Sequence, residues 1–213
     1  MKKKSLAVLF VTCIIAAAAA APAGAASLVL PRAGQVGVGL SGDFATLLKS
    51  GQLGKEFGHG PGLGVTLRYR MRYERAIGLS FHQEFLDARE SGMPEGAFIG
   101  HRDPTDSLLT RDRLNLTTTG FDFYQMFDTR TRDVKWLSLS AGLVQVSAKL
   151  SDGETQYPIG NDGTFLGAGA GLERYFYRSW AVDAAVHYRA LFYGSSVNHQ
   201  VSGTLGLVFY AAY

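Results

Sequence analysis

The sequence has little of several features that define other protein classes. Its single cysteine is Cys13, so the chain has no disulfide framework and its fold must be closed by other means. Beyond residue 26 it contains no apolar run of about 18 residues or more, which argues against helical membrane spans there.

The N-terminus predicts a cleaved secretory signal peptide over residues 1–26. Residues 2–4 are lysines, residues 6–21 form an apolar stretch, and Ala23-Gly24-Ala25 fits the small-residue cleavage pattern. A membrane anchor is the alternative, but it needs about 20 predominantly apolar residues and the stretch is shorter. Cleavage at this point also removes Cys13.

The charge of the mature chain is balanced. The full sequence carries 21 Lys+Arg against 18 Asp+Glu, and loss of the three leader lysines leaves 18 of each. The basic excess therefore belongs to the leader and does not indicate nucleic-acid binding. Residues 27–213 are one domain's worth of chain, and the 26 glycines and 12% aromatic residues suit a β-barrel better than a helical bundle.

Period-2 alternation of apolar and polar residues predicts eight strands in the mature chain. From Val201 every second residue is apolar or glycine up to Tyr213, and we expect this C-terminal strand to close a membrane barrel. The fourth strand changes phase near residues 118–120, which predicts a β-bulge. The predicted strands are 34–44, 61–71, 76–87, 112–127, 134–148, 164–175, 180–193 and 200–213.

The connections between these strands alternate in length. The short ones are 72–75, 128–133 and 176–179, and the mostly longer ones are 45–60, 88–111, 150–163 and 194–199. Outer-membrane barrels have short periplasmic turns and long outer loops. The predicted fold class is therefore all-β: a single eight-stranded antiparallel transmembrane up-and-down β-barrel with periplasmic termini. A ten-stranded version with a hairpin inside 88–111 is the alternative.

Aromatic residues gather near the strand ends on the short-turn side. Such clusters form girdles at membrane interfaces, although turn packing alone is another explanation. The predicted interfacial aromatics are Tyr69, Tyr73, Trp136, Tyr175, Tyr177, Trp180 and Tyr213.

The polar faces of several strands carry charges of both signs. A soluble ligand-binding barrel turns its apolar face inward, whereas a membrane barrel turns it outward and collects the charges in a narrow lumen, where they must be paired. We expect the membrane version, with Glu173 and Asp183 paired to Arg68, Arg70 or Arg189 as a structural plug. A gated ion path is the alternative. The predicted lumen charge network is Arg68, Arg70, Glu84, Glu173, Asp183, His187 and Arg189.

Three segments resemble the small outer-membrane β-barrel proteins of the OmpA/OmpX type. They are the glycine-alternating run from Gly167 to Tyr175, the segment from Trp180 to Arg189, and the terminal aromatic strand. The resemblance extends over residues 27–213 and concerns the barrel domain only. It implies residence in the outer membrane as a monomer, contact with outer-membrane lipid or lipopolysaccharide, and recognition of the C-terminal strand by the barrel-insertion machinery. Tyr213 stands where phenylalanine is more usual.

Motifs that suggest chemistry lack the required context. The stretch from Gly37 to Gly42 matches G-x-G-x-x-G, but it lies within a predicted strand and no helix follows. Ser80, His82 and Glu84 share one strand face, where neighbours about 7 Å apart do not readily hydrogen-bond in sequence as a triad must. The five histidines have no paired ligand spacing, so we expect no metal site and no cofactor.

The expected function is that of an integral outer-membrane barrel with a structural, surface-interaction or adhesion role, without enzyme activity. The connection 88–111, which contains Ala97-Phe98-Ile99, is the best candidate for contact with a surface partner. The alternatives are a narrow ion or small-solute channel, a lipid A-modifying enzyme and a soluble periplasmic lipid-binding barrel.

Overall fold

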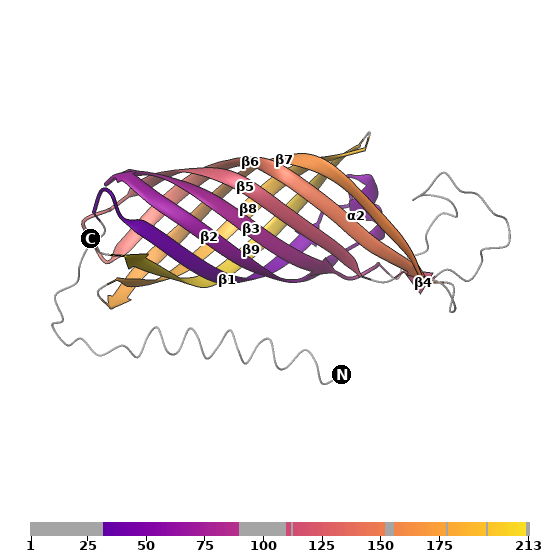
Figure 1. Ribbon diagram of the computed structural model, residues 1–213, viewed down its shortest axis with the longest axis horizontal. Coiled ribbons are helices and arrows are strands. Elements are labelled where there is room, and N and C mark those ends of the chain that lie inside the picture. The colour runs from indigo at the N-terminus through magenta and orange to yellow at the C-terminus, as the bar shows by residue number, and fades with distance from the viewer. Residues whose placement is uncertain are drawn as a thin grey trace.

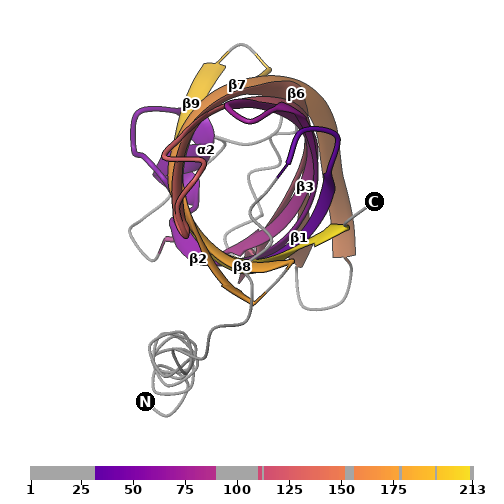
Figure 2. The same cartoon turned by 90° about the vertical axis from the view of Figure 1, so that its left-hand side faces the viewer.

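The computed structural model describes residues 32–89, 110–111, 113–151, 156–177, 179–194 and 196–211. Within these ranges the chain forms a closed antiparallel barrel of eight long strands, seen from the side in Figure 1 and along its axis in Figure 2. Each long strand pairs with the next along the chain, and the first strand closes the barrel by pairing with the last. Closure satisfies the backbone hydrogen bonds of the wall and leaves it no open edge.

The eight long strands confirm the predicted up-and-down barrel. Their bounds are β1 (Val36–Leu47), β2 (His59–Arg72), β3 (Arg75–Leu86), β5 (Leu114–Phe127), β6 (Asp133–Ser151), β7 (Gln156–Tyr177), β8 (Trp180–Tyr193) and β9 (Ser196–Ala211). A short helix, α2 (Gln52–Glu56), and a two-residue strand, β4 (Thr110–Arg111), complete the described part. No helix in the described ranges is long and apolar enough to cross a membrane. The predicted signal peptide, Tyr213 and most of the connection 88–111 lie outside the described residues.

Two predicted loops are wrong. Residues 150–163 belong largely to a long hairpin, in which β6 and β7 pair without interruption as far as Ser151 opposite Gln156. Residues 196–199 of the predicted loop 194–199 are the start of β9. The alternation of apolar and polar residues is weak in residues 150–163, so it does not mark this part of the hairpin as strand.

The predicted bulge in β5 is also wrong. The strand keeps one register through residues 118–120, where Thr118 pairs with His82 on β3 and with Val144 on β6. The apparent change of phase arises because the lumen itself changes character along its length. Leu114 and Leu116 point inward at one end of the strand, whereas from its middle onward the apolar residues Phe121, Phe123 and Phe127 point outward.

The outward face of the barrel is apolar and the inward face holds the charges. Large apolar side chains stand exposed on the strands, among them Leu40, Leu63 and Leu139, which are 64%, 67% and 66% exposed. The soluble alternative requires the opposite arrangement, with apolar side chains turned inward around a ligand. The outer wall is therefore suited to lipid, since water would leave this large apolar surface unburied.

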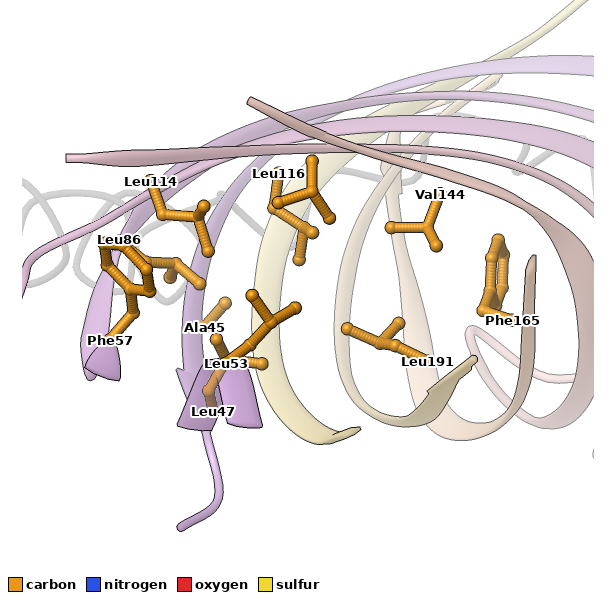
Figure 3. Close-up of a cluster of buried hydrophobic side chains, with 11 residues drawn as sticks. Ala45, Leu47, Leu53, Phe57, Leu86, Leu114, Leu116, Val144, Phe165 and Leu191 are labelled. Atoms are coloured by element: carbon orange, nitrogen blue, oxygen red, sulfur yellow. The ribbon is translucent and has the colours of Figure 1, made fainter. Parts of the chain in front are cut away.

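An apolar plug closes the lumen at the long-connection end (Figure 3). The connection between β1 and β2 folds back so that Leu53 of α2 and Phe57 are almost fully buried. Arg89 holds this connection in place by donating hydrogen bonds to the carbonyl oxygens of Phe57 and Leu47, at 2.9 and 2.8 Å. The buried plug residues are Ala45, Leu47, Leu53, Phe57, Leu86, Leu114, Leu116, Val144, Val146, Phe165 and Leu191.

Asn198 on β9 anchors the first turn of α2. Its side-chain oxygen accepts a hydrogen bond of 2.8 Å from the backbone N–H of Leu53, a helix-start group that Gly51 has no side chain to satisfy. Asn198→Ala is expected to destabilise the barrel by about 1 kcal/mol and to make the β1–β2 connection more susceptible to proteolysis. Limited proteolysis of the folded protein, with Thr119→Ala on the exposed face of β5 as control, checks this; unchanged cleavage would contradict the anchoring role.

Candidate functional site

The lumen holds two layers of polar side chains beneath the apolar plug. The layer nearer the short turns is centred on Glu173 of β7, whose side chain is fully buried. Its carboxylate pairs with Arg68 and, at 2.8 Å, with Arg70, both from β2 across the lumen. Arg68 also donates to Asp183 of β8 at 3.2 Å. Two guanidinium groups thus face two carboxylates, which is how charge is compensated in a dry interior.

Aromatic side chains complete this layer. The hydroxyls of Tyr175 and Tyr210 donate to Glu173 at 2.9 and 2.7 Å, so the carboxylate has partners on both oxygens. The Arg68 guanidinium lies 4.2 Å from the centre of the Tyr124 ring, a cation–π contact. The arginines are thereby clamped between carboxylates and ring faces.

The middle layer contains one further ion pair and a histidine–carboxylate contact. Arg189 of β8 donates to Glu84 of β3 at 3.0 Å, and Gln200 donates to the second oxygen of the same carboxylate. His82 lies 2.7 Å from Asp43 of β1. The Arg189–Glu84 pair joins strands on opposite sides of the barrel and ties the wall together across the lumen, whereas His82 and Asp43 lie on strands that flank β2.

One cavity lies between the layers. It is lined by Ser80, Asp122, His187 and their neighbours and has a volume of about 30 Å³, room for about two water molecules. A continuous aqueous path requires a column of water through the whole barrel. The apolar plug on one side and the arginine–carboxylate layer on the other interrupt such a column, so the arrangement is that of a filled lumen.

All seven residues of the predicted charge network lie on the inward face. Arg68 and Arg70 pair with Glu173, and Arg68 also pairs with Asp183; Arg189 pairs with Glu84 instead. His187 packs against the Trp136 ring with 5.7 Å between ring centroids. The prediction missed Asp43, Tyr124, Gln200 and Tyr210, although strand parity puts each of them on the inward face.

Two of the predicted interfacial aromatics are wrong. Trp136 and Tyr175 are each only 2% exposed and lie inside the lumen, because they share the inward face with Val134 and Glu173, two residues away along the strand. An aromatic residue near a strand end is not outside for that reason alone. Successive side chains of a strand point to opposite faces, so the residue's odd or even position in the strand decides its side. Tyr69, Tyr73, Tyr177 and Trp180 do lie outside at the short-turn end, where a girdle requires them.

The chemical motifs act as structural elements. Ser80, His82 and Glu84 all point into the lumen, but His82 pairs with Asp43 and Glu84 with Arg189, so they do not form a triad. Gly37 lies within β1, where a Cβ would overlap the ring of Tyr210. The described residues contain no group of three or more His, Cys, Asp or Glu that could hold a metal ion.

Known structures with the same fold are outer-membrane barrels. Neisserial surface protein A is 14% identical, covers 82% of this chain and 95% of its own, and superposes with a TM-score of 0.56. Ail, the attachment invasion locus protein of Yersinia pestis, is 16% identical over 84% and 99%, with a TM-score of 0.55. OprG from Pseudomonas aeruginosa is 10% identical over 88% and 100%, with a TM-score of 0.54. No protein-family model and no curated protein matches the sequence.

The fold and the lumen together define the class of protein. A closed barrel with an apolar outer wall and paired charges in its lumen meets the main requirements of a lipid bilayer. Eight antiparallel strands with short turns at one end are the fold that this chain shares with these outer-membrane proteins. The chain therefore has the fold of a small outer-membrane β-barrel.

Proposed function

We propose that the protein is a structural and surface-contact protein whose contacts are made by the part of the barrel beyond the membrane. The observation that carries this proposal is the projecting β6–β7 hairpin, visible at the right of Figure 1. Pairing of β7 with β8 begins only at Thr164, so residues 156–163 pair with β6 alone. Eight residues of tilted strand extend about 20 Å.

A surface role agrees with the filled lumen. The apolar plug lies at the same end as the hairpin, between the outside and the ion pairs of Glu173 and Glu84. Transport would require both the apolar plug and the ion-paired layers to rearrange. Breaking a buried ion pair costs about 3–5 kcal/mol. The lumen residues are therefore assigned to holding the barrel rigid, and the outer segments to function.

Two of the similar structures support a surface role by their names. One is called a surface protein, and Ail, the attachment invasion locus protein, has also been solved in complex with the heparin analogue sucrose octasulfate. This chain shares their fold, so a projecting outer end is a reasonable place for contact with a matrix or a neighbouring cell.

Shortening the hairpin tests the proposal. In the variant, an Asn-Gly turn replaces residues 147–160 and joins Val146 to Asn161, which already pair. Bacteria that display this variant are expected to lose about tenfold or more of their attachment to immobilised heparin or to epithelial cell layers. Replacing only residues 152–155 by Gly and Ser keeps the hairpin length and is the control.

The same preparations decide between a surface role and the alternatives. Deletion of residues 92–106 tests the connection 88–111 separately from the hairpin. Purified protein in planar bilayers is expected to give no stepwise conductance, and its overexpression to leave the mass of lipid A unchanged. Unimpaired attachment together with conductance that Arg189→Ala alters would favour the channel.

A further inference from the structure

The short-turn end of the barrel carries an excess of exposed basic side chains. Among the described residues at this end, seven basic side chains stand against three acidic ones. Six of the seven are arginines, the residue whose planar fork matches the oxygens of a phosphate group. The basic residues are Arg32, Arg72, Arg75, Arg130, Arg132, Lys135 and Arg174; the acidic ones are Glu74, Asp128 and Asp133.

Ion pairs within the protein neutralise only part of this charge. Lys135 donates to Asp128 at 2.8 Å, and Arg174 lies 3.8 Å from Asp133. Both pairs are well exposed, so they are weak. The five remaining arginines form no ion pair with the described residues, which leaves them available to an external anion.

These arginines are concentrated in two turns of similar composition. The β2–β3 turn is Tyr73-Glu74, with Arg72 and Arg75 paired across it; Tyr73 is 52% exposed. The β5–β6 turn has Arg130 and Arg132 and follows Phe127, which is 45% exposed. Exposed aromatic residues at the end of a membrane barrel mark the level of the lipid headgroups. The arginines therefore lie where phosphodiester groups are found.

We propose that each of these two turns binds the headgroup of an anionic phospholipid in the membrane leaflet at the short-turn end. In each turn, the two arginines would form charge-assisted hydrogen bonds to the phosphate, while the neighbouring aromatic ring packs against the glycerol and upper acyl chains. The assignment does not depend on the hairpin, because it concerns the opposite end of the barrel. It also gives the turns a reason to carry arginine where smaller polar residues satisfy turn geometry.

Native mass spectrometry of the detergent-solubilised full chain tests this proposal directly. Binding of phosphatidylglycerol is compared with binding of phosphatidylcholine that has the same acyl chains. The unmodified protein is expected to hold two phosphatidylglycerol molecules about tenfold more tightly than phosphatidylcholine, because each basic residue near an anionic headgroup adds to the attraction. The variants R72Q/R75Q and R130Q/R132Q are each expected to lose one of these two sites, and their combination both.

The variant K49Q/K55Q provides a matched control. It also removes two exposed positive charges, but next to α2 at the other end of the barrel, and is expected to retain both lipid sites. Each variant is first shown to be folded by its change of gel mobility on boiling in SDS. Inorganic phosphate at the lipid concentration is expected not to displace the lipid.

Several results would overturn the proposal. Equal affinity for phosphatidylglycerol and phosphatidylcholine would contradict a site for anionic headgroups. If K49Q/K55Q lost as much phosphatidylglycerol binding as the turn variants, the binding would depend on net charge alone. Displacement of the lipid by inorganic phosphate would show a free-anion site. Arginine-dependent sedimentation with isolated peptidoglycan, without a lipid preference, would assign the turns to the cell wall polymer.

Discussion

Replacing Glu173 by alanine is expected to destabilise the barrel by about 3–5 kcal/mol, because it leaves buried charges without a partner. The carboxylate is fully buried and is shared by Arg68 and Arg70, which are themselves almost completely excluded from solvent. Its removal also takes the acceptor from the hydroxyls of Tyr175 and Tyr210. Urea unfolding in lipid vesicles, followed by tryptophan fluorescence, measures the change.

Two comparisons show whether the effect comes from the buried charge. Asp133→Ala removes a half-exposed carboxylate 3.8 Å from Arg174, near the same end of the barrel, and is expected to cost about 1 kcal/mol or less. Changing Glu173 and Arg70 together to methionine removes a charge of each sign, so the double variant is expected to be more stable than Glu173→Ala. A Glu173→Ala variant as stable as Asp133→Ala would mean that the lumen is hydrated, as a channel requires.

Introducing a charge on the outer wall has the second largest expected effect. Leu79 is 55% exposed on β3, at the centre of the outward row formed with Ile77 and Phe81. Its neighbours on the adjoining strands are Leu67 and Phe121, so the surroundings are apolar on both sides. Leu79→Arg is expected to cost about 2–4 kcal/mol in a bilayer, the range found for arginine near the membrane midplane.

The position of the substitution provides the control. Tyr73→Arg introduces the same side chain at the β2–β3 turn, where the cost near the interface falls to about 0–1 kcal/mol. Equilibrium unfolding of both variants in vesicles gives the two values. In a soluble barrel an arginine at position 79 would be solvated and nearly neutral. Equal and small effects at both positions would therefore contradict the lipid-facing assignment of the apolar wall.

The two largest effects rest on the same division of the barrel into an inward and an outward face. The outward face is adapted to lipid and tolerates no charge at its centre. The inward face is adapted to carry charges, and Arg68, Arg70 and Arg189 each pair there with a carboxylate on another strand. With lipid around the outer face and paired side chains across the lumen, the two ends of the barrel are the surfaces where other molecules can make contact.

The sequence by itself determined the architecture because alternation with period 2 is a local property. In β2, Leu63 and Leu67 alternate with residues that include Arg68, and each side chain is on the face that its parity predicts. Where one face contacts lipid, the pattern is strong enough to locate the strand. It disappears in the outer half of the β6–β7 hairpin, so the sequence placed a loop there.

The tertiary structure alone decided which charges meet and what closes the lumen. Their alternating positions in the strands put Glu84, Glu173 and Arg189 inside. The level of each side chain along the barrel axis, however, depends on the register and tilt of all eight strands. Arg189 therefore lies beside Glu84, 105 residues away in sequence, and not beside Glu173. The folding of Leu53 into the mouth is likewise non-local, because it depends on Asn198 at the far end of the chain.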